Sequence, residues 1–137
     1  MSPLKLRLNA EREQIQQALD LIPEKLDGLT PLELAGLGSM IHSIYNGMEN
    51  MLRQIFREER IELPDSAFWH KELLERACTE GIISDQTLEA LKEYLGFRHF
   101  FVHAYCPQLD LERLRPLVEK VPAVVERFLQ DLQDPWL

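Results

Sequence analysis

A regular apolar spacing in the first half of the sequence limits the folds open to this chain more than any other feature. Apolar residues recur every third or fourth position between residues 34 and 55, which is the spacing of one face of an α-helix. This face consists of Leu34, Leu37, Ile41, Ile44, Met48, Met51 and Ile55. Thr30, Pro31 and Glu33 precede it and combine a capping box with proline at the first helical position. The pattern predicts a long amphipathic helix that packs in a bundle.

The rest of the sequence predicts further helices. Similar spacing occurs in residues 9–28, 66–80, 84–102 and 110–132. Asn9 and Ser84 are predicted N-caps, and Pro23 is expected to kink the first of these helices. No long alternation of apolar and polar residues favours a sheet. Because the connections are short, we expect consecutive helices to be antiparallel neighbours. The predicted fold is all-α, an up-and-down bundle of about five helices in a single domain, residues 1–137.

Composition and charge narrow the class of protein. The chain is 45% hydrophobic and 28% charged, a balance typical of a globular domain. Cys78 and Cys106 form no C-x-x-C motif, which indicates a reducing compartment. We expect no signal peptide in residues 1–9 and no membrane-spanning segment, so the predicted location is the cytoplasm. The net charge of −8 argues against broad nonspecific nucleic-acid binding, but it leaves room for a local basic pocket or a basic partner.

The fourth predicted helix carries a charge where its pattern requires an apolar residue. The spacing of Leu88, Leu91 and Leu95 leads to Arg98. The aromatic residues around this position are Tyr94, Phe97, Phe100 and Phe101. We therefore expect Arg98 to point inward and part of the aromatic cluster to lie at a homodimer interface. Burial of an unpaired charge is costly. Arg98 therefore either pairs with a carboxylate such as Glu49 and fixes the bundle register, or has a functional role.

Three stretches of the sequence carry a family resemblance. Residues 98–105 read R-x4-H-x-Y, residues 45–50 read Y-N-G-M-E-N, and residues 66–74 read S-A-F-W-H-K-E-L-L. The first stretch resembles the signature of HepT-like ribonuclease toxins of the HEPN superfamily, and the other two resemble stretches of the same family. They lie in order on three of the five predicted helices. This resemblance implies a HEPN-like helical fold.

The resemblance also implies an activity and a site. It implies the toxin of a type II toxin–antitoxin system, an endoribonuclease that uses no metal or other cofactor and acts at a homodimer interface. Arg98 would hold the phosphate, and His103 would act as general base or acid. The implied partner is a cognate nucleotidyltransferase antitoxin, with Tyr105 as the acceptor of AMP. Positions 98 and 103 point roughly 140° apart on a regular helix, so we expect either fraying near His103 or a contribution from both chains.

Four further polar residues lie in or beside these three stretches. We predict that His99 contacts RNA or supports the reactive pair. Glu49 either orients Arg98 and tunes the histidine, or is a solvated carboxylate on a helix face. The pattern around His70 predicts a packed helix residue that belongs to the fold architecture. His42 lies beside an apolar position and is assigned no role.

Two other function classes stay open at the level of sequence. One is a non-catalytic HEPN module that binds a nucleotide or a partner nucleotidyltransferase, which the acidic charge favours. The other is a helical scaffold, which leaves the polar residues of the aromatic zone unexplained. The presence of both Arg98 and His103 favours the enzyme. His99, His103 and Cys106 do not form the ligand set of a zinc site, so no metal site is predicted.

Overall fold

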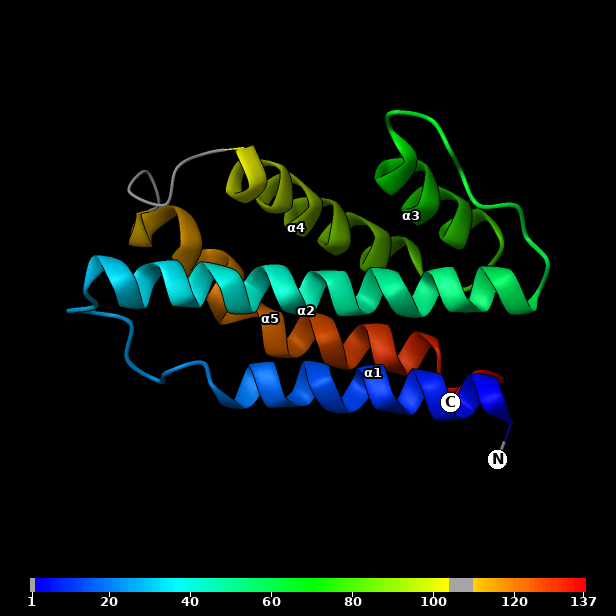
Figure 1. Ribbon diagram of the computed structural model, residues 1–137, viewed down its shortest axis with the longest axis horizontal. Helices are drawn as coiled ribbons and strands as arrows, with labels where there is room; N and C mark the ends of the chain where they lie inside the picture. Colours follow the sequence, from blue (N-terminus) through cyan, green and yellow to red (C-terminus); the bar gives the residue numbers. More distant parts are fainter. Residues whose placement is uncertain (1, 104–109) are drawn as a thin grey trace.

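The computed structural model describes residues 2–103 and 110–137, and for residues 102 and 103 it describes the backbone alone. Five helices follow one another in this part of the chain (Figure 1). They are α1 (Pro3–Asp20), α2 (Pro31–Glu58), α3 (Trp69–Thr79), α4 (Asp85–His103) and α5 (Leu111–Asp131). No strand occurs among the described residues. The predicted all-α bundle of five helices is confirmed.

Helix α2 forms the centre of the bundle and contacts each of the other four helices. Its start matches the prediction, since the Thr30 hydroxyl accepts a hydrogen bond from the Glu33 backbone N–H at 3.1 Å. The Glu33 carboxylate in turn accepts one from the Thr30 N–H at 2.9 Å. All predicted apolar positions are buried except Leu34, which is half-buried. Tyr45 and Phe56 are buried as well, so α2 is covered on more than one face.

The boundaries of α1 differ from the prediction. The helix begins at Pro3 instead of near Asn9, because Ser2 caps it by accepting a backbone hydrogen bond from the first turn at 3.2 Å. It ends at Asp20, so Pro23 lies beyond the helix and does not kink it. The serine–proline pair at the start of α1 is the same kind of signal as the threonine–proline pair of α2.

Helix α3 starts at Trp69, later than predicted, because Ser66 orders the turn before it. The Ser66 hydroxyl accepts a hydrogen bond from the Phe68 N–H at 3.1 Å and donates one to a carboxylate of α3 at 2.7 Å. The starts of α4 and α5 match the prediction. Ser84 accepts a hydrogen bond from the first turn of α4 at 3.2 Å, and Asp110 accepts one from the first turn of α5 at 2.8 Å.

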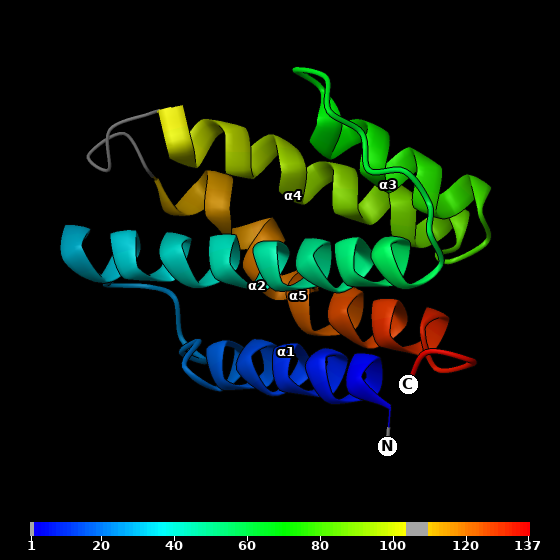
Figure 2. The same ribbon diagram turned by 45° about the vertical axis from the view of Figure 1, so that its right-hand side comes forward.

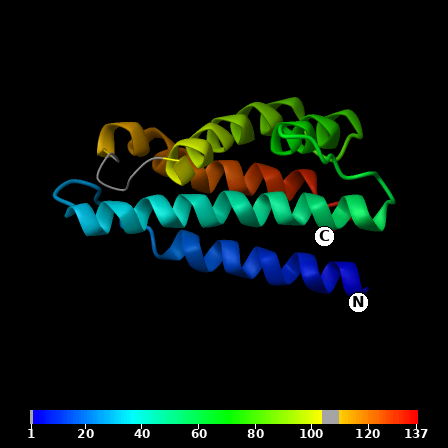
Figure 3. The same cartoon turned by 45° about the horizontal axis from the view of Figure 1, so that its top comes forward.

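Consecutive helices are antiparallel, as expected, except α2 and α3, for which the expectation is wrong (Figure 2). Helices α1 and α2 are antiparallel, and so are α4 and α5 (Figure 1). The segment of residues 59–68 crosses back over the bundle, so that α3 runs in the same general direction as α2 (Figure 2). Helix α1 lies on the opposite side of α2 from α3 and α4 (Figure 3). Helix α4 therefore contacts α2, α3 and α5, and these three contacts position the candidate site.

Helices α1 and α2 approach each other closely at Gly47. A methyl group added to its Cα atom would lie 2.7 Å from Cγ1 of Ile15 on α1. Glycine inside a helix costs roughly 1 kcal/mol relative to alanine. The close packing of the two helices offsets this cost, which explains a glycine inside the Y-N-G-M-E-N stretch.

Candidate functional site

Arg98 lies on the flank of α4, next to its buried face. That face consists of Thr87, Leu91, Tyr94 and Phe97, whereas Arg98 is half-buried. The sequence pattern predicts that Arg98 points inward, but the buried position of this turn is its neighbour Phe97. The reason is that aromatic residues lie on several sides of the C-terminal end of α4, so the spacing of apolar residues there does not by itself select the buried face.

One atom of the Arg98 guanidinium is both buried and unpartnered. Its Nε has no hydrogen-bond partner among the described residues. The expected ion pair with Glu49 is absent from this part of the chain, where Glu49 pairs with His70 instead. A buried donor without an acceptor costs about 1–3 kcal/mol, and more when the group is charged. The structure thus holds a guanidinium whose buried donor no described carboxylate satisfies.

Arg98 lines a basic cleft of about 460 Å³ between α3 and α4. The cleft is lined by Ala67, Phe68, His70, Lys71, Lys92, Leu95, Gly96, Arg98 and His99. Among these described lining residues, none carries a carboxylate, whereas three carry a permanent positive charge. One of the three, Lys92, pairs with Glu89 at 3.6 Å. A local group of cations can bind a phosphate even on a protein whose net charge is −8.

Glu49 is buried and joins α2 to α3. Its side chain is 4% exposed and accepts a hydrogen bond from the Tyr45 hydroxyl at 2.8 Å. Both of its oxygens lie near Nδ1 of His70, at 2.9 and 2.8 Å. The alternative of a solvated carboxylate is therefore wrong. Glu49 orients His70 directly, and it does not hold Arg98 by an ion pair.

His70 is the site residue that the sequence interpretation missed. Its Nδ1 faces Glu49, which leaves Nε2 as the ring nitrogen not bonded to that carboxylate, and the residue lines the Arg98 cleft. The ring also stacks on Trp69 at a centroid distance of 3.5 Å. A histidine held by a carboxylate through one nitrogen is a common arrangement for proton transfer at the other nitrogen. His70 thus combines the architectural role predicted for it with a position beside the phosphate-binding candidate.

Two groups of α2 beside this network have altered acidity. Burial, and then the charge of Arg98, lower the pKa of His42, and Glu49 partly opposes them. The Nε2 of His42 is buried without a partner among the described residues, and its ring lies 5.4 Å from that of Phe101. Burial and the neighbouring Glu49 raise the pKa of Tyr45 far above its ordinary value. Tyr45 therefore stays a neutral donor to Glu49.

The aromatic cluster of α4 is only partly covered by the chain itself. Phe97 is buried at 6% exposure, while Phe100 and Phe101 are half-buried. Arg113 of α5 lies over the Phe100 ring at 4.5 Å. Two rings thus keep accessible surface, and the homodimer interface at this helix stays a prediction.

The remaining predicted site residues lie at the end of α4. His99 is exposed and lines the cleft. His103 is the last residue of α4, and its side chain is not among those described. Tyr105 and Cys106 lie outside the described residues. The pairing of Arg98 with His103 and the modification of Tyr105 therefore stay predictions.

Two searches of the described residues concern metals and membranes. In residues 2–103 and 110–137, no group of three or more His, Cys, Asp or Glu side chains is arranged to hold a metal ion. Within the same residues, no helix combines the length and the apolar character needed to cross a bilayer.

Comparison with known proteins identifies a family. The family model described as HepT-like protein matches residues 36–134. This segment contains most of α2 and all of α3, α4 and α5, and with them Glu49, His70 and Arg98; α1 lies outside it. No match was found among curated proteins or among solved structures.

Proposed function

The chain belongs to the HepT-like protein family, and from this premise we propose that it is a metal-independent endoribonuclease, the toxin of a type II toxin–antitoxin system. We expect it to act in the cytoplasm. The observation that carries the proposal is the unpartnered Nε of Arg98 beside a basic cleft. The planar fork of a guanidinium matches the oxygens of a phosphate group.

The proposed reaction uses the RNA's own ribose as the nucleophile. A general base removes the proton of a 2′-hydroxyl, the 2′ oxygen attacks the adjacent phosphorus, and the 5′ oxygen leaves with a proton from a general acid. The products are a 2′,3′-cyclic phosphate and a 5′-hydroxyl end, and the step consumes neither water nor a redox partner. Two proton-transfer groups and one cation are sufficient for this chemistry.

We assign these roles to Arg98 and His70 of the cleft and to His103. Arg98 stabilises the charge that develops on the phosphate oxygens. His103 provides one proton transfer, as the family resemblance implies. His70, whose Nδ1 is fixed by Glu49 at 2.8 Å, provides the second at Nε2. His99 contacts the RNA at the rim of the cleft.

A homodimer would complete the site, and a partner nucleotidyltransferase would control it. AMP transferred to Tyr105 would place an anion beside Arg98 and exclude RNA by volume and charge. Tyr45 and Tyr94 are each 1% exposed, so they are poor acceptors in the folded chain. After co-expression with the partner, intact-mass and peptide analysis should find AMP on Tyr105. An unchanged mass, or AMP on another tyrosine, would contradict this assignment.

A second candidate function is a non-catalytic module that binds a nucleotide or the nucleotidyltransferase. The net charge of −8 favours this candidate, because an acidic protein attracts RNA weakly at long range. It uses the same basic cleft without a cleavage step.

One experiment separates the two functions. A defined RNA oligonucleotide is incubated with the protein and an excess of chelator, and the products are identified by mass spectrometry. We expect 2′,3′-cyclic phosphate ends with the wild type and none with His103→Ala. Cleavage that disappears with the chelator, or that persists in His103→Ala, contradicts the proposed mechanism. Nucleotide binding without cleavage favours the non-catalytic module.

A further inference from the structure

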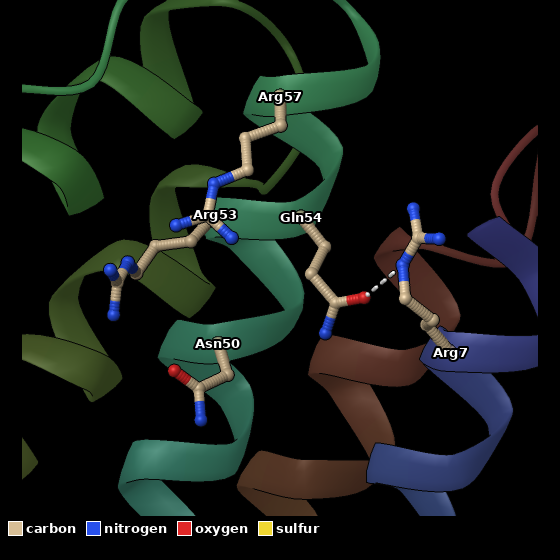
Figure 4. Close-up of a pocket in the computed structure, with 5 residues that line it drawn as sticks. All are labelled: Arg7, Asn50, Arg53, Gln54 and Arg57. Carbon is tan, nitrogen blue, oxygen red and sulfur yellow. Dashed lines mark hydrogen bonds between the residues drawn. The ribbon is translucent and has the colours of Figure 1, made fainter.

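A second basic cleft lies between α1 and α2, with a volume of about 430 Å³ (Figure 4). It is lined by Arg7, Asn50, Arg53, Gln54 and Arg57. The four residues from α2 follow the spacing of one helix face. Figure 4 shows Arg7 reaching across from α1 toward Gln54, and its Nε donates a hydrogen bond to the Gln54 side-chain oxygen at 3.0 Å. Two helices thus build one polar cleft.

Three positively charged side chains, Arg7, Arg53 and Arg57, line this cleft. None of its arginines takes part in the ion pairs of this part of the chain. Arg53 and Arg57 are four residues apart, where like charges destabilise a helix. The chain as a whole carries a net charge of −8. Three arginine and two amide side chains that line one cleft offer the hydrogen-bond donors and the positive charge that an anion requires.

The cleft is connected to the Arg98 cleft through aromatic contacts. The guanidinium carbon of Arg53 lies 5.3 Å from the centroid of the Trp69 ring. Trp69 stacks on His70 at 3.5 Å, and His70 lines the Arg98 cleft. Along α2, Arg53 and Arg57 follow Glu49 by one and two turns, or about 6 and 12 Å at the rise of an α-helix. The two clefts therefore lie within the span of a few nucleotides, with Trp69 between them.

We propose that the α1–α2 cleft binds backbone phosphates of the RNA strand whose scissile phosphate lies at Arg98. This inference rests on the proposed ribonuclease function. Arg7, Arg53 and Arg57 would contact the phosphates through their guanidinium groups. Arg7 lies outside the segment matched by the family model, so part of this site belongs to α1.

The test measures RNA binding under conditions in which cleavage does not occur. A fluorescently labelled, unstructured single-stranded RNA is titrated with protein carrying His103→Ala, and affinity is followed by anisotropy at several salt concentrations. Each phosphate contact contributes about 0.7 to the slope of log affinity against log salt concentration for a single strand. The double variant Arg7→Gln/Arg57→Gln should therefore bind RNA more weakly and lose roughly 1.4 of this slope. Both side chains are exposed, so the fold should be retained.

A matched control removes two arginines elsewhere. Arg12→Gln/Arg127→Gln changes exposed residues of α1 and α5 and alters the net charge by the same amount as the cleft variant. Because neither residue lines the α1–α2 cleft, the slope should stay unchanged. An equal loss in the control, an unchanged slope in the cleft variant, or no RNA binding by the parent protein overturns the proposal. Polyglutamate is titrated in the same way as a model of an acidic protein. If the cleft variant binds RNA like the parent protein but loses binding to polyglutamate, the cleft is a protein-docking site and the proposal is overturned. If RNA binding falls as expected while the wild type cleaves no RNA, the ribonuclease function fails and the binding site stands.

Discussion

The two ends of α4 carry polar groups in opposite states. At its start, the Ser84 hydroxyl donates to the Thr87 hydroxyl at 3.0 Å and the Ser84 N–H donates to Asp131 of α5 at 3.0 Å. The Thr87 hydroxyl also donates to Asp131. Near its other end, Nε of Arg98 and Nε2 of His42 are buried without a partner among the described residues.

This difference separates an anchor from a site. Buried polar groups in folded proteins are almost always hydrogen-bonded, so a satisfied cluster contributes to stability. Unsatisfied groups cost stability and persist where function requires them. We infer that Asp131 fixes α4 to α5, whereas Arg98 is retained for a ligand. Changes at the two ends should therefore affect stability and activity differently.

Removal of Glu49 should have the largest effect on stability. Glu49→Ala leaves the buried Tyr45 hydroxyl and the His70 ring without their common partner, which should cost about 3 kcal/mol in the free energy of unfolding. Glu49→Gln keeps an acceptor for Tyr45 and should cost clearly less. Denaturant unfolding of both variants measures the difference, and an equal loss would contradict the network.

Asp131→Ala should perturb the satisfied end of α4. Thr87 is 1% exposed and loses its acceptor, so we expect a loss of about 2 kcal/mol in unfolding free energy. RNA cleavage by the folded fraction should be unchanged, because Asp131 lies at the opposite end of α4 from Arg98. Glu126→Ala, which changes an exposed residue of α5, should alter neither the unfolding free energy nor RNA cleavage. A specific loss of cleavage in Asp131→Ala would break the distinction between the two ends.

His42 should produce the smallest effect, as a dependence of stability on pH. Burial and the charge of Arg98 hold its pKa below the ordinary value, so the unfolded chain binds this proton more readily. The fold therefore loses stability as the pH falls through the ordinary pKa of histidine. This loss stops once the pH lies below the pKa that His42 has in the folded chain. His42→Phe should therefore lose less stability than the wild type as the pH falls from about 7 to about 5. Identical pH profiles of the two proteins would show that the surroundings of His42 do not disfavour its protonated form.

Local signals made most of the fold predictable. Thr30, Ser84 and Asp110 mark helix starts within their own sequence neighbourhood, and the structure confirms all three. Ser2 carries the same type of signal but lies where no apolar stripe had yet begun, so α1 was predicted to start too late. The return of the chain in residues 59–68 depends on packing between α3 and α4, which spacing along the sequence does not encode.

The site was predictable only in part. Arg98 stands out because it interrupts an apolar pattern, and this can be read from one helix. Glu49 and His70 lie on two different helices and are 21 positions apart in the sequence, and no periodicity connects them. Their membership in two of the three family-like stretches was the one signal that could have paired them.

We infer that Arg98 is retained for an anion and not for folding. Arg98→Met keeps an unbranched side chain and removes both the charge and the unpartnered donor, and it should be assayed for RNA cleavage and for unfolding in the same preparation. We predict that cleavage falls roughly 10²–10³-fold, while the unfolding midpoint is unchanged or higher. Cleavage at the wild-type rate, or a loss of cleavage explained by unfolding at the assay temperature, would contradict the claim.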